Sequence, residues 1–172
     1  MYFFATRDEL LKDNISFWKS DGTEQGTQLV KDDVGYTTAG VLPRIEILNN
    51  QMLFLTRASV GDSLFLQLWK SDGTEAGTGI LKKAGRDYSA GADNATGELT
   101  PFNGKLYFNF YDTGGGSEPF FTDGTLAGTQ ILKDIQTEPT GLNITPSYPH
   151  RFTVIGNVLY FWAIRYVDGF GL

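Results

Sequence analysis

The sequence predicts an all-β protein made of tandem four-stranded antiparallel repeats. The phrase Trp-Lys-Ser-Asp-Gly-Thr occurs twice, at 18–23 and 69–74, and a related copy, Phe-Phe-Thr-Asp-Gly-Thr, occurs at 120–125. The aspartates of the three copies, Asp21, Asp72 and Asp123, are 51 residues apart both times. A fixed interval of this size marks a repeat architecture in which each repeat is one supersecondary unit. The chain is rich in glycine (21) and in aromatic residues (13 Phe, 8 Tyr, 3 Trp), and its apolar segments are short. No long stretch keeps helical spacing, so we expect little helix.

The middle repeat illustrates the predicted elements in order. Bulky β-favouring residues at 53–56 predict a first strand, and the alternation at 64–70 predicts a second. Asp72-Gly73 then turns the chain into a third strand at 79–82. After a Gly-containing loop, residues 99–102 predict the fourth strand. The dipeptide Asn103-Gly104 follows directly and predicts a hairpin into the next unit, because both residues tolerate positive φ.

The first strand of each unit carries its own recurring apolar phrase. The four copies are residues 2–4, 53–55, 106–108 and 159–161. Alignment of Met1, Leu53, Leu106 and Leu159 gives intervals of 52, 53 and 53 residues, and the variable loops absorb the difference. We therefore expect one repeat domain over 1–172, with these units: 1–52, 53–105, 106–158 and a partial unit, 159–172.

Repeats of four strands and this length are typical of β-propeller blades, although three units also suit a β-trefoil. The fourth first-strand copy favours the propeller, because a closed threefold fold has no place for it. Three blades and part of a fourth cannot close a ring, so we expect either a homo-oligomer or a segment of a longer repeat chain.

Composition excludes several classes of function. The chain has 14 basic and 20 acidic residues, a net charge of −6, which disfavours nucleic-acid binding. It has no cysteine and one histidine, His150, which excludes thiolate sites, histidine triads and multi-histidine metal centres. No apolar run is long enough for a membrane helix, and residues 1–5 are too short and lack the basic lead of a signal peptide.

The repeated phrase resembles the ELWxxDGT repeat family, a group of bacterial exported and surface-associated repeat proteins. The Asp-Gly-Thr-x-x-Gly-Thr half is intact in all three copies: residues 21–27, 72–78 and 123–129. The front half drifts, and its Glu position holds Ser16, Gln67 and Glu118. The resemblance implies a propeller-like array and an extracellular or cell-surface location. The family has no assigned chemistry, so the resemblance implies no catalytic residue.

The turns are the first candidate site. Asp21, Asp72 and Asp123 could offer carboxylates to Ca²⁺, but turn chemistry explains the phrase more fully, since Asp accepts from nearby amides and Gly supplies positive φ. We expect no other cofactor. The residues that complete the three turns are Gly22, Thr23, Gly73, Thr74, Gly124 and Thr125.

Aromatic residues at repeat positions are the second candidate site. They are core residues in the simplest interpretation, and a platform for sugar stacking in the alternative: Trp18, Trp69, Tyr107 and Tyr160. The preferred prediction is a non-enzymatic, exported module that presents a binding, adhesion or scaffold surface. A carbohydrate-binding, lectin-like propeller is the first alternative. A glycoside hydrolase-like propeller fragment is the second, although no pair of adjacent carboxylates recurs.

Overall fold

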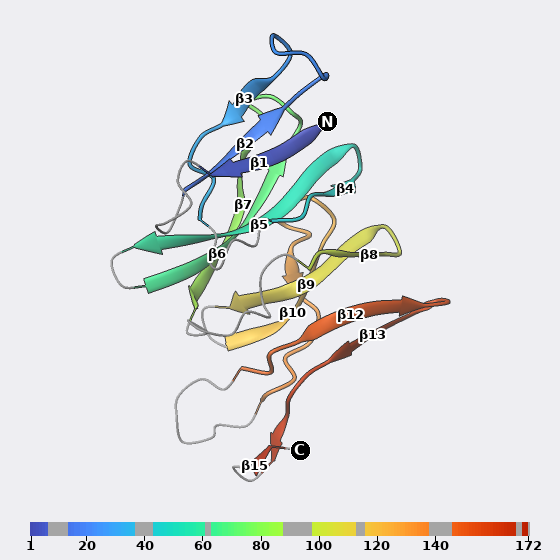
Figure 1. Ribbon diagram of the computed structural model, residues 1–172. Helices are drawn as coiled ribbons and strands as arrows, with labels where there is room; N and C mark the ends of the chain where they lie inside the picture. The colour runs from blue at the N-terminus through green and yellow to red at the C-terminus, as the bar shows by residue number, and fades with distance from the viewer. Residues whose placement is uncertain are drawn as a thin grey trace.

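The computed structural model shows an all-β chain of small antiparallel sheets that lie one upon another (Figure 1). It describes these residues: 1–6, 14–36, 43–60, 63–87, 98–112, 116–137, 146–167 and 170–171. All regular secondary structure in these ranges is β, which confirms the predicted class. The same ranges contain no helix of the length and apolarity needed to cross a membrane.

Sheet A, at the top of Figure 1, has three strands: β1 (Tyr2–Thr6), β2 (Ile15–Lys19) and β3 (Gln28–Lys31). Trp18 of β2 lies opposite Phe3 on one side and opposite Leu29 on the other. Directly opposite residues share a face of a sheet, so these three side chains form one row across sheet A.

Sheet B is the central four-stranded meander: β4 (Glu46–Leu48), β5 (Gln51–Val60), β6 (Ser63–Ser71) and β7 (Gly79–Asp87). β4 and β5 are joined by Asn49 and Asn50, whose φ values are 50° and 61°. Asn adopts positive φ more readily than most residues, which suits it to this two-residue turn. The row Phe54, Trp69 and Ile80 repeats the row of sheet A.

Sheet C repeats the four-stranded meander: β8 (Thr100–Phe102), β9 (Lys105–Asp112), β10 (Gly116–Thr122) and β11 (Gln130–Ile131). The predicted Asn103-Gly104 hairpin is confirmed, with φ of 46° and 71°. The assignment of residues 99–102 as the last strand of the middle unit was wrong. This strand pairs with β9 and opens the next sheet, because a two-residue turn forces its two flanking strands to pair.

Sheet D is a hairpin of β12 (His150–Ile155) and β13 (Val158–Trp162), which lies below sheet C in Figure 1. A separate short hairpin follows, made of β14 (Tyr166–Val167) and β15 (Phe170–Gly171). The described residues form these five sheets and no closed barrel or ring.

The face that sheet B turns to sheet A is aromatic. Phe54 is fully buried there, with its ring centroid 5.0 Å from that of Phe4 and 5.2 Å from that of Phe17. Trp69 stacks on Phe54 at 6.0 Å with an interplanar angle of 6°. Met52, Ile15 and other residues complete this first core.

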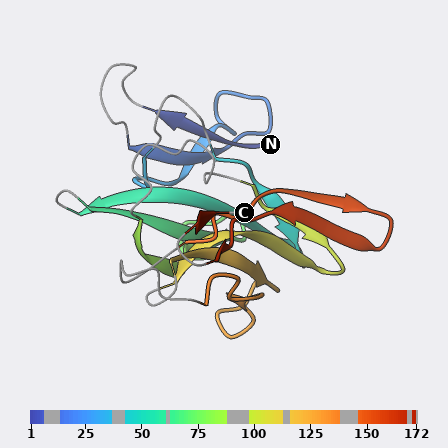
Figure 2. The same ribbon diagram turned by 90° about the horizontal axis from the view of Figure 1, so that it is seen from below.

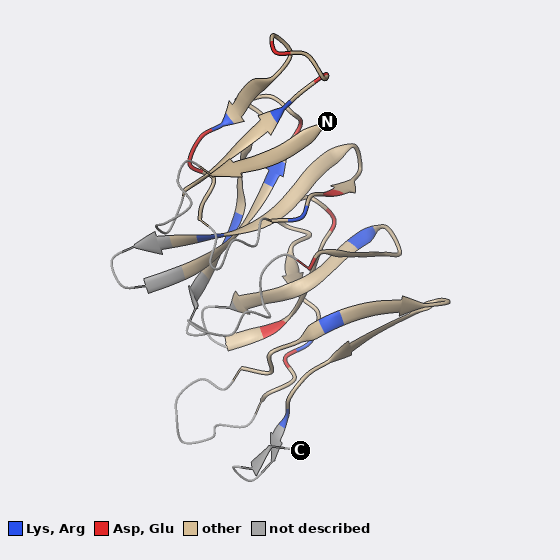
Figure 3. Cartoon of the chain, in the orientation of Figure 1, with Lys and Arg blue, Asp and Glu red and all other residues tan. Residues whose placement is uncertain are grey.

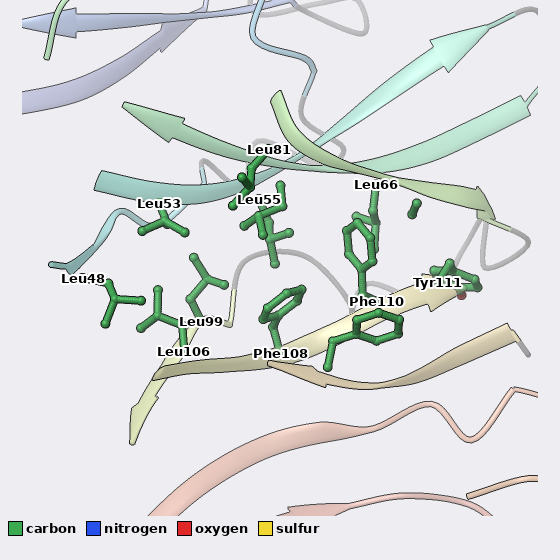
Figure 4. Packing of buried hydrophobic residues seen from close by; sticks show 13 residues of the cluster. Leu48, Leu53, Leu55, Leu66, Leu81, Leu99, Leu106, Phe108, Phe110 and Tyr111 are labelled. Carbon is green, nitrogen blue, oxygen red and sulfur yellow. The ribbon is translucent and has the colours of Figure 1, made fainter. Parts of the chain in front are cut away.

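The opposite face of sheet B is aliphatic and packs on the aromatic face of sheet C. Figure 4 shows Leu53, Leu55 and Leu66 pointing toward Leu106, Phe108 and Phe110. All six side chains are 2% exposed or less. Both faces of sheet B are therefore covered, as in a stack of sheets whose strands alternate between two cores.

The strand pairing corrects the alignment of the first-strand phrases by one residue. Phe3 lies opposite Trp18 and Phe54 opposite Trp69, and the residue opposite Phe120 is Phe108. The alignment from the sequence instead placed Tyr107 at the position of Phe54. A shift of one residue exchanges the two faces of a strand, so Tyr107 turns away from sheet B while Phe108 is buried against it.

Candidate functional site

The three Asp-Gly-Thr turns have the same hydrogen bonds in all three sheets. In the first turn, Asp21 Oδ1 accepts from Thr23 N at 2.9 Å and from Thr23 Oγ1 at 2.8 Å. Gly22 N donates to Ser20 Oγ at 3.0 Å, and Thr27 Oγ1 donates to Thr23 O at 2.6 Å. The corresponding bonds of the second and third turns agree with these within about 0.1 Å. The repeated phrase therefore encodes one turn geometry.

Two glycines are required in each turn for different reasons. Gly22 has φ of 96°, and Gly73 and Gly124 have φ of 89° and 90°, a region that disfavours any residue with a Cβ. The second glycine, Gly77 in the middle turn, sits against the Asp72 carboxylate, so that a Cβ there would overlap its oxygens. Gly26 and Gly128 have the same environment in the other two turns.

The same hydrogen bonds hold the pKa of all three aspartates below the ordinary carboxyl value of 3.8. The backbone N–H of Thr23 is the largest cause for Asp21, followed by the Thr23 hydroxyl. The hydroxyls of Thr74 and Thr125 are the largest causes for Asp72 and Asp123. The carboxylates are thus used as acceptors within their own turns.

The second and third turns contact the sheet that precedes them. Glu75 lies in the middle turn and forms an ion pair with Lys31 of sheet A, with 3.8 Å between Nζ and Oε1. In the third turn, Asp123 O accepts from Asn49 Nδ2 at 3.2 Å, and Thr129 O accepts from Lys82 Nζ at 3.1 Å. These contacts place the second and third turns in the interfaces between neighbouring sheets.

The first turn lacks this cover. Gly22 and Thr27 are exposed, whereas the equivalent Gly73 and Gly124 are buried and the equivalent threonines, Thr78 and Thr129, are only 5% and 2% exposed. Identical turns thus differ in burial because sheets B and C have a preceding sheet, whereas no described strand precedes sheet A in the stack (Figure 1).

The predicted metal residues are not brought together. Asp21, Asp72 and Asp123 lie in three turns that belong to three sheets. Within the described ranges, no group of three or more His, Asp or Glu side chains is placed to hold a metal ion.

The Glu position of the repeat is buried in each sheet and used differently in each. Ser16 Oγ donates to Asp32 Oδ1 at 2.5 Å, and Gln67 Oε1 accepts from Trp69 Nε1 at 3.3 Å. Glu118 is fully buried, and its Oε2 accepts from Ser147 Oγ at 2.7 Å and from Ile135 N at 3.0 Å. This carboxylate ties sheet C to the segment that leads into sheet D.

Glu118 is a buried ionisable residue whose burial the sequence did not predict. Its Oε1 is buried and has no hydrogen-bond partner among the described residues, and burial raises the pKa of the carboxyl. The sequence signal was present, since Glu118 occupies the Glu position of the repeat phrase, but its drift in the other two copies concealed the burial.

The predicted aromatic residues occupy different environments. Trp69 is 6% exposed and its Nε1 donates to Thr56 Oγ1 at 3.0 Å, so its proposed role in sugar stacking is wrong for this fold.

Trp18 and Tyr107 are half-buried. Trp18 stacks on Phe3 at 6.4 Å, and its indole N–H has no hydrogen-bond partner in the described part of the chain. Ala5 stands where sheet B has Thr56, which explains the missing acceptor.

Tyr160 is the one predicted aromatic that is exposed, and it is part of a larger surface. β13 alternates: Val158, Tyr160 and Trp162 are 49%, 53% and 67% exposed, while Leu159 and Phe161 turn to the other face. There the ring of Phe161 stacks on the buried Phe152 at 5.2 Å.

Ile155, opposite Val158 on β12, is 64% exposed and extends this face, which sequence reasoning recognised only at Tyr160. Figure 2, the view from below, shows the hairpin in front of sheets B and C. Arg151 is the one charged residue in the sequence of this hairpin, 150–162, whose ribbon is mostly tan in Figure 3. We name Ile155, Val158, Tyr160 and Trp162 the trailing face. The alternation of β13 predicts such a surface once the register is known.

Searches of protein-family models, of curated proteins and of solved structures found no match to this chain.

Proposed function

We propose that the chain is a non-enzymatic binding or scaffold module that contacts another protein through an exposed sheet face. The observation that carries this proposal is the trailing face, where Tyr160 and Trp162 are more than half exposed beside apolar neighbours. An exposed cluster of large apolar side chains with almost no charge is typical of a protein-interaction surface. Trp and Tyr are also the residues most often found at energetic centres of interfaces.

The geometry of the turns supports a structural role for the most regular polar groups of the chain. Each turn aspartate accepts two hydrogen bonds from its own threonine, and the covered turns pack between sheets. The phrase that defines the repeat thus has a structural role within the stack, and the outer faces of the stack are available for recognition.

The wider setting belongs to the same proposal. The stacked four-stranded meanders are arranged as propeller-like blades, and the resemblance of the Asp-Gly-Thr turns to the ELWxxDGT repeats supports export to the cell surface or beyond. A polar, acidic protein whose sheets are stacked and whose repeats are held by turn chemistry suits adhesion or scaffolding there.

A photo-crosslinker tests this proposal. Benzoylphenylalanine in place of Tyr160 is expected to form a discrete covalent adduct with a protein of the source organism. The same group in place of Leu126, which is 63% exposed in the third turn, is the matched control. The partner, identified by mass and purified, must bind the wild-type chain and lose affinity for Trp162→Ala. Equal labelling at both positions, or no adduct, refutes the proposal.

Carbohydrate binding is the second candidate, and the exposure of Tyr160 and Trp162 on one face favours it. Aromatic side chains that are two residues apart on a strand can stack on successive sugar rings. Retention of the wild-type chain on a polysaccharide, with loss of retention for Trp162→Ala and not for Leu126→Ala, would establish this candidate in place of a protein partner.

A further inference from the structure

We infer that the two ends of the sheet stack are complementary and that the chain associates head to tail with a second copy of itself. The second copy would place the leading face of its sheet A, defined as Phe3, Trp18 and Leu29, on the trailing face of hairpin β12–β13. This inference rests on the proposed function and names the partner and the contact.

The chain's internal interfaces supply the template. Sheets B and C each turn an aromatic pair toward the preceding sheet: Phe54 with Trp69, and Phe108 with Phe120. These four side chains are 0–6% exposed. Sheet A carries the same pair, Phe3 with Trp18, on the same face, but both residues are only half-buried. The leading face therefore has the composition of an interface whose other half is missing.

The trailing face corresponds to the other half. Counted from their two-residue turns, Ile155, Tyr160 and Trp162 occupy the positions that Leu48, Leu53 and Leu55 occupy in sheet B. The three leucines are 8%, 0% and 2% exposed because sheet C covers them, whereas Ile155, Tyr160 and Trp162 are 64%, 53% and 67% exposed. All three are large and apolar or aromatic, as such an interface requires.

The first turn gives an independent argument. In the interface between sheets B and C, the third turn lies over the β4–β5 hairpin, and a Cβ on Gly124 would be 3.7 Å from Gln51 and 4.0 Å from Leu48. The positions equivalent to Gln51 and Leu48 in sheet D are Val158 and Ile155. The uncovered turn at Gly22 would meet them when a second copy is seated in the same way.

A head-to-tail contact joins two different surfaces, so the association either closes into a ring or extends into a chain. It therefore makes a prediction that a contact between identical faces does not. A copy that is defective at one end must still bind a copy that is defective at the other end.

The experiment uses two single variants, Leu29→Asp at the leading face and Trp162→Asp at the trailing face. Both side chains are exposed, 45% and 67%, so the substitutions leave the cores intact. Leu126→Asp, at a 63% exposed position outside both faces, is the control. Sedimentation velocity over a concentration series measures the mass of each protein and of the mixtures.

The wild type and the control are expected to increase in mass with concentration. Each end-face variant alone is expected to weaken association about tenfold or more, because each places a carboxylate among the apolar side chains of the contact. An equimolar mixture of Leu29→Asp and Trp162→Asp is expected to give a heterodimer that grows no further.

A wild-type chain that stays monomeric throughout the series overturns the inference, as does a mixture of the two variants that fails to form the heterodimer. If the chain is monomeric but the crosslinker at position 160 still captures an identified and reconstituted partner, the head-to-tail contact is wrong and the proposed scaffold function stands. A specific polysaccharide ligand for this face, with no self-association, refutes both.

Discussion

Replacement of Phe54 by alanine tests whether the sheets are stacked as described. Phe54 is fully buried between sheets A and B and contacts the rings of Phe4, Phe17 and Trp69. Loss of the phenyl group removes a transfer free energy of about 2–3 kcal/mol and leaves a cavity, and core Phe→Ala changes together cost about 3–5 kcal/mol. We expect Phe54→Ala to lower the free energy of unfolding by that amount.

Phe3→Ala is the matched control, because Phe3 occupies the same position in sheet A with its outer side uncovered. A half-buried ring loses about half of the transfer term and leaves little cavity, so the expected cost is about 1 kcal/mol. For a chain of this size, a difference of 2–4 kcal/mol between the two variants is worth roughly 4–16 °C in Tm. Phe54→Leu, expected to cost less than Phe54→Ala, provides a measurement if the alanine variant does not fold.

The assay is urea unfolding at low protein concentration, followed by tryptophan fluorescence. Trp69 stacks on Phe54 and reports the same interface. Equal costs for Phe54→Ala and Phe3→Ala would refute the stacking of sheet A on sheet B, because a preceding sheet covers Phe54 and no described sheet covers Phe3.

Further predictions concern the turns and the buried carboxyl. Gly77→Ala is expected to lower Tm because its Cβ displaces the Asp72 carboxylate, whereas Gly79→Ala, with open space around it, is expected to be close to neutral; similar Tm values for the two would contradict the turn geometry. Because the pKa of Asp72 is lowered, its contribution to stability is present above pH 3.8 and is lost as the pH falls through the folded-state pKa. The stability difference between wild type and Asp72→Asn should therefore shrink in acid. A stability difference that does not depend on pH would contradict the prediction. The raised pKa of Glu118 has the opposite effect on stability: the contribution of this group to the free energy of unfolding is full below pH 4.5 and is lost as the pH rises through the folded-state pKa. Glu118→Gln should therefore gain stability relative to wild type between pH 4.5 and neutrality in urea titrations. A stability difference that stays constant over this pH range would contradict the prediction. Calcium and EDTA are expected to leave Tm unchanged, since each turn offers one carboxylate already bonded within the turn, and a calcium-dependent rise would restore the metal hypothesis.

The sequence was sufficient for the local features of the fold. The Asp-Gly-Thr phrase predicted its turn because the acceptor, the positive-φ glycine and the threonine hydroxyl are all supplied within seven residues. The Asn103-Gly104 hairpin was predicted for the same reason, since two neighbouring residues determine its geometry. Short-range hydrogen bonds and φ preferences need no information from the rest of the chain.

The sequence by itself therefore determined the class, the repeat, its turns and most of its strands. The tertiary structure decided which strand belongs to which sheet, which side of each strand is buried, and which copy of a repeated residue is exposed. Trp18, Trp69 and Tyr160 illustrate the difference: all three are bulky aromatics at repeat positions, yet they are half-buried, buried and exposed. The reason is physical, because burial depends on whether a neighbouring sheet covers a face, and a shift of one residue in register moves a side chain to the other face.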